Sequence, residues 1–443
     1  MADLDLVEFA VDYARQKGAT YAEARYEHQR NEEFILKNSV LDALYITEDS
    51  GLGVRVLAKG GLGFAATNGM TKTDVRAIVD DAVRIAKAAR RKDPIVFAPE
   101  DPIVMEWSVP QKKKLSDVPV EEKIEEILHI DRELADLKLK ILARFFQQAN
   151  RQIDKYFVNS EGSKIRSFSP RVRLDYFLTV MHEGSAEQSH QSYGWSGGWE
   201  AVREIDMLRR TLDEAKSMQN ALAHGKKSPE GKMDLVAGPM VAGIASHESC
   251  GHPTEADRVL GREASQAGKS FITPTSIGQK VGSPVVNVVD DPTMEHAIAF
   301  YVTDDEGVKA RRRYLYKDGL INEFLQNRET AAVLGTQSNG ASRAVTYNVE
   351  AIVRMANTFV EPKDWGTDEM LEDVKYGVYM KSFMEWNIDD KRYNGKYVGR
   401  EAYLIEKGEV TTPVRNTVVE LTTPAFWGAG DAVGKDFELV PSG

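Results

Sequence analysis

The sequence predicts a mixed α+β protein of two domains. Stretches of alternating apolar and polar residues, separated by turn residues, are typical of antiparallel strands, and they stand beside segments with the period of amphipathic helices. The chain has 443 residues, which is more than one hydrophobic core usually organises. We therefore expect sheets flanked by helices in each of two domains.

The first part of the chain predicts helices around a group of strands. Apolar residues at helical spacing over residues 4–14, followed by Gly18, predict an amphipathic helix and its end. Residues 21–68 alternate between short apolar stretches and glycine-containing turns, which favours antiparallel strands. A helix over residues 72–89 is expected to cover one face of these strands.

A second group of strands follows a proline-rich segment. Residues 92–119 contain five prolines and three consecutive lysines, so we expect a surface connection there. A helix over residues 120–137 leads into strands over residues 139–201, with a hairpin turn at residues 159–162. The glycine- and serine-rich residues 192–198 are expected to form an exposed loop.

A polar cluster predicts the boundary between the domains. A helix should end near Ala223, and residues 224–231 combine charged residues with proline and glycine, as linkers do. We expect one domain over residues 1–225 and a strand-rich domain over residues 226–443. In the second domain, Pro239 fits the first turn of a helix that runs towards Cys250, and another helix is expected at residues 323–334.

Composition excludes several classes of protein. The 57 basic residues against 68 acidic residues give a net charge of −11, the opposite of the charge that attracts nucleic acid. The N-terminus lacks the pattern of a secretory signal, and no apolar run is long enough to span a membrane. Cys250 is the only cysteine, which fits a reducing compartment. We expect a cytoplasmic protein that binds neither nucleic acid nor membranes.

The residues that carry chemistry lie in one short segment. His247, Glu248 and His252 offer two imidazoles, which bind divalent metal ions, and a carboxylate that can take a proton from water. The zinc-peptidase pattern H-E-x-x-H has its histidines four apart, but here they are five apart, which leaves them about 140° out of line on a regular helix. A π-bulge, or a helix that ends at Gly251, would absorb the extra residue. Pro253 favours an ending there.

Three other features have simpler explanations. Cys250 could be a ligand or a nucleophile, but free cysteines are commonly buried, and we expect burial. His182-Glu183 repeats the start of the motif without a second histidine at the required spacing, so we expect a histidine on the surface of a strand. Residues 304–307 (Asp-Asp-Glu-Gly) lack the pattern of a calcium loop and predict a turn that faces the substrate cleft.

The motif resembles the H-E-x-x-x-H motif of the TldD/PmbA family of metallopeptidases, including Glu255 and Asp257 that follow it. Further segments are similar to this family along nearly the whole chain; they are residues 51–56, 61–68, 303–308, 354–358 and 399–405. Each segment is weak evidence by itself, whereas their order and spacing together are specific.

The resemblance implies a two-domain α+β architecture with curved sheets and a dimer that encloses the active site. It also implies peptidase activity on short or unfolded chains, with His247 and His252 as ligands of a divalent metal ion, for which zinc fits best, and Glu248 as the general base. Some family members pair with a sister subunit that lacks the motif. This chain therefore resembles the motif-bearing half of a homodimer or heterodimer.

The sequence differs from the family pattern at the third metal ligand. Family members usually supply a cysteine within a C-G-K segment near the C-terminus, whereas Val433 precedes Gly434-Lys435 here. We expect sequence beyond Gly443 to supply this cysteine, so that a chain ending there would be depleted of metal or inactive. Cys250, Glu255 and Asp257 are the alternatives within the chain.

Three functions remain open from the sequence. The first is a metal-dependent peptidase, the second a non-catalytic partner or scaffold subunit of a dimeric protease, and the third a metal hydrolase of other amides or esters. Metal content separates the second from the others, and a peptide-cleavage assay separates the first from the third.

Overall fold

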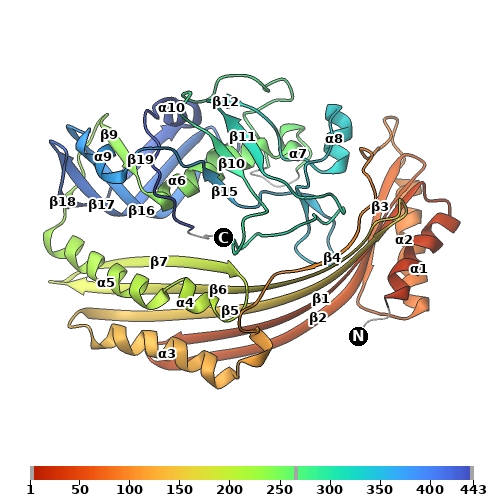
Figure 1. Cartoon of the computed structure of the whole chain (residues 1–443), viewed down its shortest axis with the longest axis horizontal. Helices are drawn as coiled ribbons and strands as arrows, with labels where there is room; N and C mark the ends of the chain where they lie inside the picture. The colour runs from red at the N-terminus through yellow and green to blue at the C-terminus, as the bar shows by residue number, and fades with distance from the viewer. Residues whose placement is uncertain (1–3, 264–267, 440–443) are drawn as a thin grey trace.

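The other parts of the molecule pack against a long curved sheet. The computed structural model describes residues 4–263 and 268–439. The C-terminal half lies on the concave side of the sheet, and helices cover the other side near both ends (Figure 1). The predicted α+β class, with curved antiparallel sheets flanked by helices, is confirmed.

The curved sheet consists of strands from the first 196 residues. Its order is β3-β2-β1-β5-β6-β4, with β7 also paired to β6, and all pairs are antiparallel except β4 with β6. Its strands are β1 (Tyr21–Lys37), β2 (Val40–Ala58), β3 (Gly61–Thr67), β4 (Val104–Ser108), β5 (Lys140–Asn159), β6 (Lys164–His182) and β7 (Ser185–Ser196).

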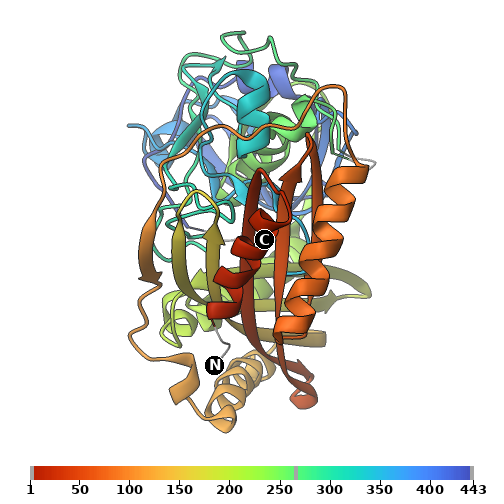
Figure 2. The same ribbon diagram turned by 90° about the vertical axis from the view of Figure 1, so that its right-hand side faces the viewer.

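The helices of this half bury the apolar side of the sheet. Helices α1 and α2 lie side by side against one end (Figure 2), where their valines and alanines pack on apolar side chains of β1 and β2. Helices α3 and α5 form a second core with β6 at the other end. The helices are α1 (Asp5–Gln16), α2 (Lys72–Ala88), η1 (Leu115–Asp117), α3 (Val120–Asp136), α4 (Ala201–Glu204) and α5 (Met207–His224).

The C-terminal half is rich in strands, as the sequence predicts. Its largest sheet has the order β8-β18-β17-β16-β9, with β19 paired to β17, and a smaller sheet has the order β12-β11-β10-β15. The strands are β8 (Lys226–Lys227), β9 (Asp234–Ala237), β10 (Val288–Asp290), β11 (Arg313–Lys317), β12 (Leu320–Ile321), β13 (Ser342–Arg343), β14 (Ile352–Val353), β15 (Thr358–Val360), β16 (Tyr376–Ile388), β17 (Asn394–Glu406), β18 (Glu409–Arg415) and β19 (Val418–Thr422).

The helices of the C-terminal half are short. They are α6 (Pro239–Ser246), α7 (Ala256–Val259), α8 (Arg328–Leu334), α9 (Thr367–Glu372) and α10 (Thr423–Gly428), with one π turn and one 3₁₀ turn after α6. Helix α8 begins five residues after the predicted start, because Asn327 caps it by accepting a hydrogen bond from the backbone N–H of Thr330. No helix in the described ranges is long and apolar enough to cross a membrane.

One expectation about loops was wrong, and another was incomplete, because the predicted surface connection also contains a strand. Residues 192–196 belong to β7 and most of residues 192–198 are buried, because Gly194 packs against Ile298 of the C-terminal half. The proline-rich connection contains β4, which lies along β6. In both cases a distant segment supplies the packing partner, which local composition does not reveal.

The acidic turn at residues 304–307 lies in the contact between the two halves instead of facing a cleft. Asp305 pairs with Lys155 of β5 (Nζ to Oδ1, 2.9 Å), and Glu306 pairs with Arg55 of β2 (Nη2 to Oε1, 2.7 Å). Both Glu306 and Arg55 are buried. This turn therefore fixes the C-terminal half on the concave face of the sheet. The predicted boundary falls between α5 and β8, and a division into domains at residues 225 and 226 stays a prediction.

Candidate metal centre

The backbone of the motif changes its helical type. Helix α6 begins with Pro239 and ends at Ser246, a π turn follows over His247–Gly251, and a 3₁₀ turn over His252–Thr254 contains Pro253. The π turn absorbs the extra residue of the H-E-x-x-x-H spacing, as predicted. Gly251 closes this turn directly against the Met355 sulfur, where no Cβ atom would fit.

The structure brings the three predicted site residues together. One ligand atom from each of His247, Glu248 and His252 lies within 4.8 Å of the other two. The two imidazole rings are 4.8 Å apart between centroids and nearly perpendicular, at 83°. Two ring nitrogens and a carboxylate at this separation could hold one divalent cation.

Glu255 orients the second histidine. Its Oε2 lies 3.0 Å from Nδ1 of His252, which leaves Nε2 of that imidazole for a metal. Arg258 donates to the same oxygen. Burial opposes ionisation of Glu255, but the hydrogen bond with His252 and the charge of Arg258 outweigh burial and lower its pKa to about 2. An ionised carboxylate behind a histidine is the usual support of a metal ligand.

His247 lies at the wall of a large cavity. Its side chain lines a cavity of about 1140 Å³ between α6, the 356–360 segment and residues 425–439. Burial, and then the neighbouring His252, lower the pKa of His247 to about 3. The imidazole is therefore neutral near pH 7 and able to bind a metal ion. Val433 lines the same cavity.

Arg392 contacts the predicted general base. Its Nη1 donates to Oε2 of Glu248, and both side chains are largely buried. The backbone of Arg392 has a φ of +64° in the turn between β16 and β17, and its carbonyl accepts a hydrogen bond from Thr423. Close by, the hydroxyl of Tyr397 is buried without a partner in the described part of the chain, and burial together with Glu248 raises its pKa.

Cys250 and Asp257, two of the alternative ligands, lie in surroundings that differ from those of the two histidines. Cys250 is fully buried in the apolar core of the C-terminal half, as predicted, and burial raises its pKa well above the ordinary value. The Asp257 carboxylate accepts from the backbone N–H of Arg258, and burial, with the charge of Glu255, raises the pKa of Asp257 to about 7. Neither belongs to the group of ligand atoms around His247 and His252.

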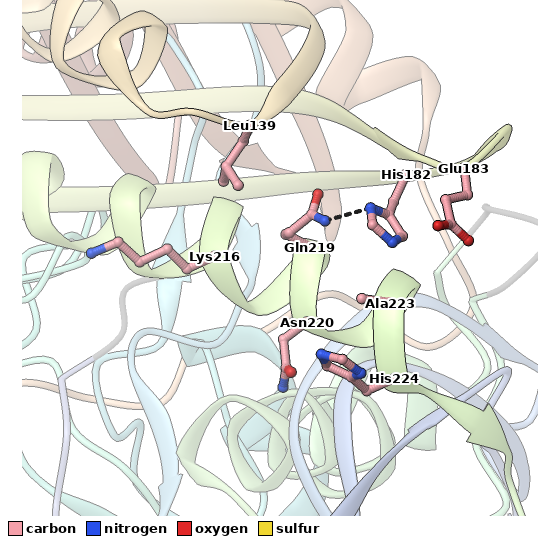
Figure 3. A pocket seen from close by; sticks show the side chains of 8 residues that line it. All are labelled: Leu139, His182, Glu183, Lys216, Gln219, Asn220, Ala223 and His224. Atoms are coloured by element: carbon pink, nitrogen blue, oxygen red, sulfur yellow. Dashed lines mark hydrogen bonds between the residues drawn. The ribbon is translucent and has the colours of Figure 1, made fainter.

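The second His-Glu pair lies in a surface pocket far from the motif in the sequence. His182 ends β6, and its Nδ1 lies 2.7 Å from the amide nitrogen of Gln219 on α5 (Figure 3). Glu183 forms the turn to β7 with a φ of +46°, and its side chain lines the same pocket (Figure 3). The surface position agrees with the prediction.

Two residues of the centre had no signal in the sequence. Arg392 lies 144 positions after Glu248 in an ordinary polar turn, and Arg258 resembles any helical arginine. Only the fold brings them to the motif. The role of Glu255 had one signal, its position directly after the H-E-x-x-x-H segment.

Comparisons with known proteins show the family of this chain. Three family models match the chain: PmbA/TldA metallopeptidase domain 1 over residues 22–86, the central domain over residues 113–219, and the C-terminal domain over residues 230–443. Together these models match most of the chain.

Similar proteins carry metalloprotease names. A metalloprotease of Methanocaldococcus jannaschii is 30% identical over 95% of this chain and 90% of its own length. A protein named zinc metalloprotease TldD homolog, from Saccharolobus solfataricus, is 26% identical over 96% of this chain and 91% of its own length. The structure of TldE from Thermococcus kodakarensis has the same fold, with a TM-score of 0.79 at 15% identity, and the match covers 97% of this chain and 94% of that one. On these matches, the chain belongs to the PmbA/TldD family of metallopeptidases.

Proposed function

We propose that this chain is a metal-dependent peptidase that hydrolyses short or unfolded peptides, with His247 and His252 as metal ligands and Glu248 as general base. The observation that supports the proposal is the convergence of His247, Glu248 and His252, of which His247 lines a cavity. At about 1140 Å³, the cavity exceeds the usual volume of small-molecule sites, which favours a peptide substrate.

The residues present fit a divalent metal, and zinc fits best. Two imidazoles, one of them supported by the Glu255 carboxylate, form the donor set that zinc hydrolases share. When bound, the ion would polarise the scissile carbonyl and make water more acidic. A zinc metalloprotease name among the relatives supports the same choice.

In this proposal, Glu248 moves the proton of the reaction. As water adds to the carbonyl carbon, a Glu248 carboxylate oxygen accepts its proton, and the same oxygen gives a proton to the amine nitrogen as the C–N bond breaks. Arg392 holds the other side of this carboxylate and orients it. Tyr397, with its unpartnered buried hydroxyl nearby, offers a further donor within the centre.

The proposal gives Glu248 and His247 different roles, and two variants test this difference. Glu248→Gln should retain metal and stay folded, with lower stability because Arg392 loses its partner, while losing cleavage of an unfolded test protein, since the base is removed and the ligands are kept. His247→Ala should lose the metal, measured by elemental analysis. Equal loss of metal in both variants would show instead that Glu248 is a ligand.

A dimer is proposed as the working form, either of two copies or with a sister subunit. The name of the TldE structure supports a partner of the same fold. The outer edge of β2 between Val40 and Gly51 has no strand partner among the described residues, and it bears five exposed apolar side chains: Val40, Leu41, Leu44, Tyr45 and Ile46. Such an edge favours pairing with another chain. Sedimentation of a fully active monomer at micromolar concentration would refute this proposal.

The second candidate is a non-catalytic subunit. It is favoured by one observation, that among the described residues the ion has only two histidines and one carboxylate, the carboxylate being paired with Arg392. Metal analysis decides between the candidates, because a scaffold subunit would retain no stoichiometric ion.

A further inference from the structure

A row of arginines crosses the concave face of the curved sheet. Arg151 of β5 and Arg171 of β6 are directly opposite in the antiparallel register, so both side chains project from the same face. Like charges in this arrangement repel and are unfavourable. Arg343 reaches the same place from the C-terminal half and adds a third positive charge next to Arg171.

Among the described residues, these three arginines form no ion pair with an acid. Arg151 donates to the side-chain oxygen of Gln29 and to the carbonyl of Val345, and Arg343 donates to the carbonyl of Met355. The Nε atoms of Arg171 and Arg343 are buried with no partner in the part of the chain that the structure describes. Most guanidinium groups in this protein instead form ion pairs, as Arg173 does with Asp175 two positions further along β6 (2.9 Å).

The nearest acids are already engaged. The carboxylates that act on Arg171 are those of Asp305 and Glu27, and Lys155 lies 2.9 Å from the first and 3.6 Å from the second. Burial, and then the charges of Arg343 and Arg151, lower the pKa of Arg171 to about 10. A buried charge of this kind is unfavourable unless an anion balances it.

Residues next to the arginine cluster lead to the cavity of the metal centre. Ser196, the register partner of Arg171, donates to the carbonyl of Ile298, and Ile298 lines the cavity that contains His247. Arg343 donates to the carbonyl of Met355, and the next residue, Ala356, lines the same cavity. Beside the cluster Val345 is 73% exposed, so solvent reaches this region.

We propose that Arg171, Arg151 and Arg343 form a subsite that binds a carboxylate of the peptide substrate. Guanidinium groups bind carboxylates through paired, charge-assisted hydrogen bonds, and the acids nearest to Arg171 are already paired with Lys155. The recessed position and the net charge of −11 disfavour a nucleic acid as the ligand. This inference rests on the proposed peptidase function. It specifies the substrates as peptides with a C-terminal carboxylate or an acidic side chain.

The test compares three forms of one otherwise neutral peptide, labelled at its N-terminus with a dansyl group. One has a free C-terminal carboxylate, one a C-terminal amide, and one the amide with a single internal glutamate. Binding is measured by fluorescence anisotropy in the zinc-loaded Glu248→Gln background, where turnover is blocked. The two acidic forms separate a terminal carboxylate from a side-chain carboxylate as the ligand.

We expect Arg171→Gln to lose the preference for acidic over neutral peptides. Arg171→Gln should weaken binding of the preferred acidic peptide at least about tenfold while the neutral amide binds as before. The matched control is Arg173→Gln, on the same face of the same strand, which removes an arginine that already has an acidic partner and should change neither peptide. Thermal unfolding of Arg171→Gln should occur at the same or a higher temperature, since an unbalanced charge is removed.

Several results would overturn the subsite. Equal effects of Arg171→Gln on acidic and neutral peptides, or a lowered unfolding temperature, would make this arginine structural. A change in the sedimentation coefficient of Arg171→Gln would indicate that the arginine cluster contacts a partner subunit and not a peptide. If the proposed function fails, wild-type protein will cleave none of the peptides, while the anisotropy measurement still decides whether the carboxylate is bound.

Discussion

Arg392 is hydrogen-bonded to Glu248, so a turn of the large C-terminal sheet holds the central carboxylate of the motif. Removing one partner of a buried ion pair leaves the other charge unbalanced, which destabilises a protein by about 3–5 kcal/mol. We predict this loss for Arg392→Gln, measured by urea unfolding. The double variant with Glu248→Gln should recover part of it, whereas additive losses would show that the two groups do not interact.

The support of His252 by Glu255 predicts a selective effect on metal affinity. Glu255→Gln should weaken metal binding about 10–100-fold, because the carboxylate that fixes the imidazole is lost. Competition with a chromogenic chelator measures this change. Asp257→Asn is the control, since its carboxylate bonds the backbone of Arg258 and not a histidine. An equal change in both variants would argue against a specific role of Glu255.

The contact between Gly251 and Met355 predicts that the π turn tolerates no side chain at its end. Gly251→Ala should destabilise the protein by about 1–3 kcal/mol through overcrowding, measured by thermal unfolding. Adding Met355→Ala should relieve part of the loss. Gly243→Ala in α6, where nothing lies within 4 Å of the new Cβ atom, should be neutral or stabilising. Similar losses at both glycines would contradict this explanation.

The acidic turn predicts a pH-dependent contribution to stability. Burial opposes ionisation of Asp305, but Lys155, Arg25 and the backbone N–H of Ala344 outweigh it and lower its pKa to about 2 from the ordinary 3.8. A carboxyl with a lower pKa in the folded state adds stability above its ordinary pKa, about 2 kcal/mol here, and loses it as the pH falls from about 4 towards 2.

Asp305→Asn therefore should unfold more easily than the wild type in urea at neutral pH, and the difference should narrow below about pH 4. The exposed pair of Arg166 with Asp154 provides a control, because Asp154→Asn should change stability by less than about 1 kcal/mol at any pH. A difference for Asp305→Asn that does not depend on pH would contradict the ionised pairing with Lys155.

Local patterns in the sequence determined much of the secondary structure and the centre of the site. The predicted helix over residues 72–89 is α2, because regular apolar spacing and the cap at Thr71 act within a few residues. The π turn also followed from local geometry, since histidines five positions apart do not share one face of a regular helix. Ligand type and spacing in the motif are local properties of the chain, and they sufficed to indicate a metal centre.

Tertiary structure alone decided which distant residues complete that centre. Arg392 reaches Glu248, and Arg343 reaches Arg171, only because strand register and the docking of the two halves bring them together. The burial of Gly194 depends in the same way on Ile298. The energies that set these contacts come from packing between elements that are far apart in the sequence, and neither periodicity nor composition records which elements will meet.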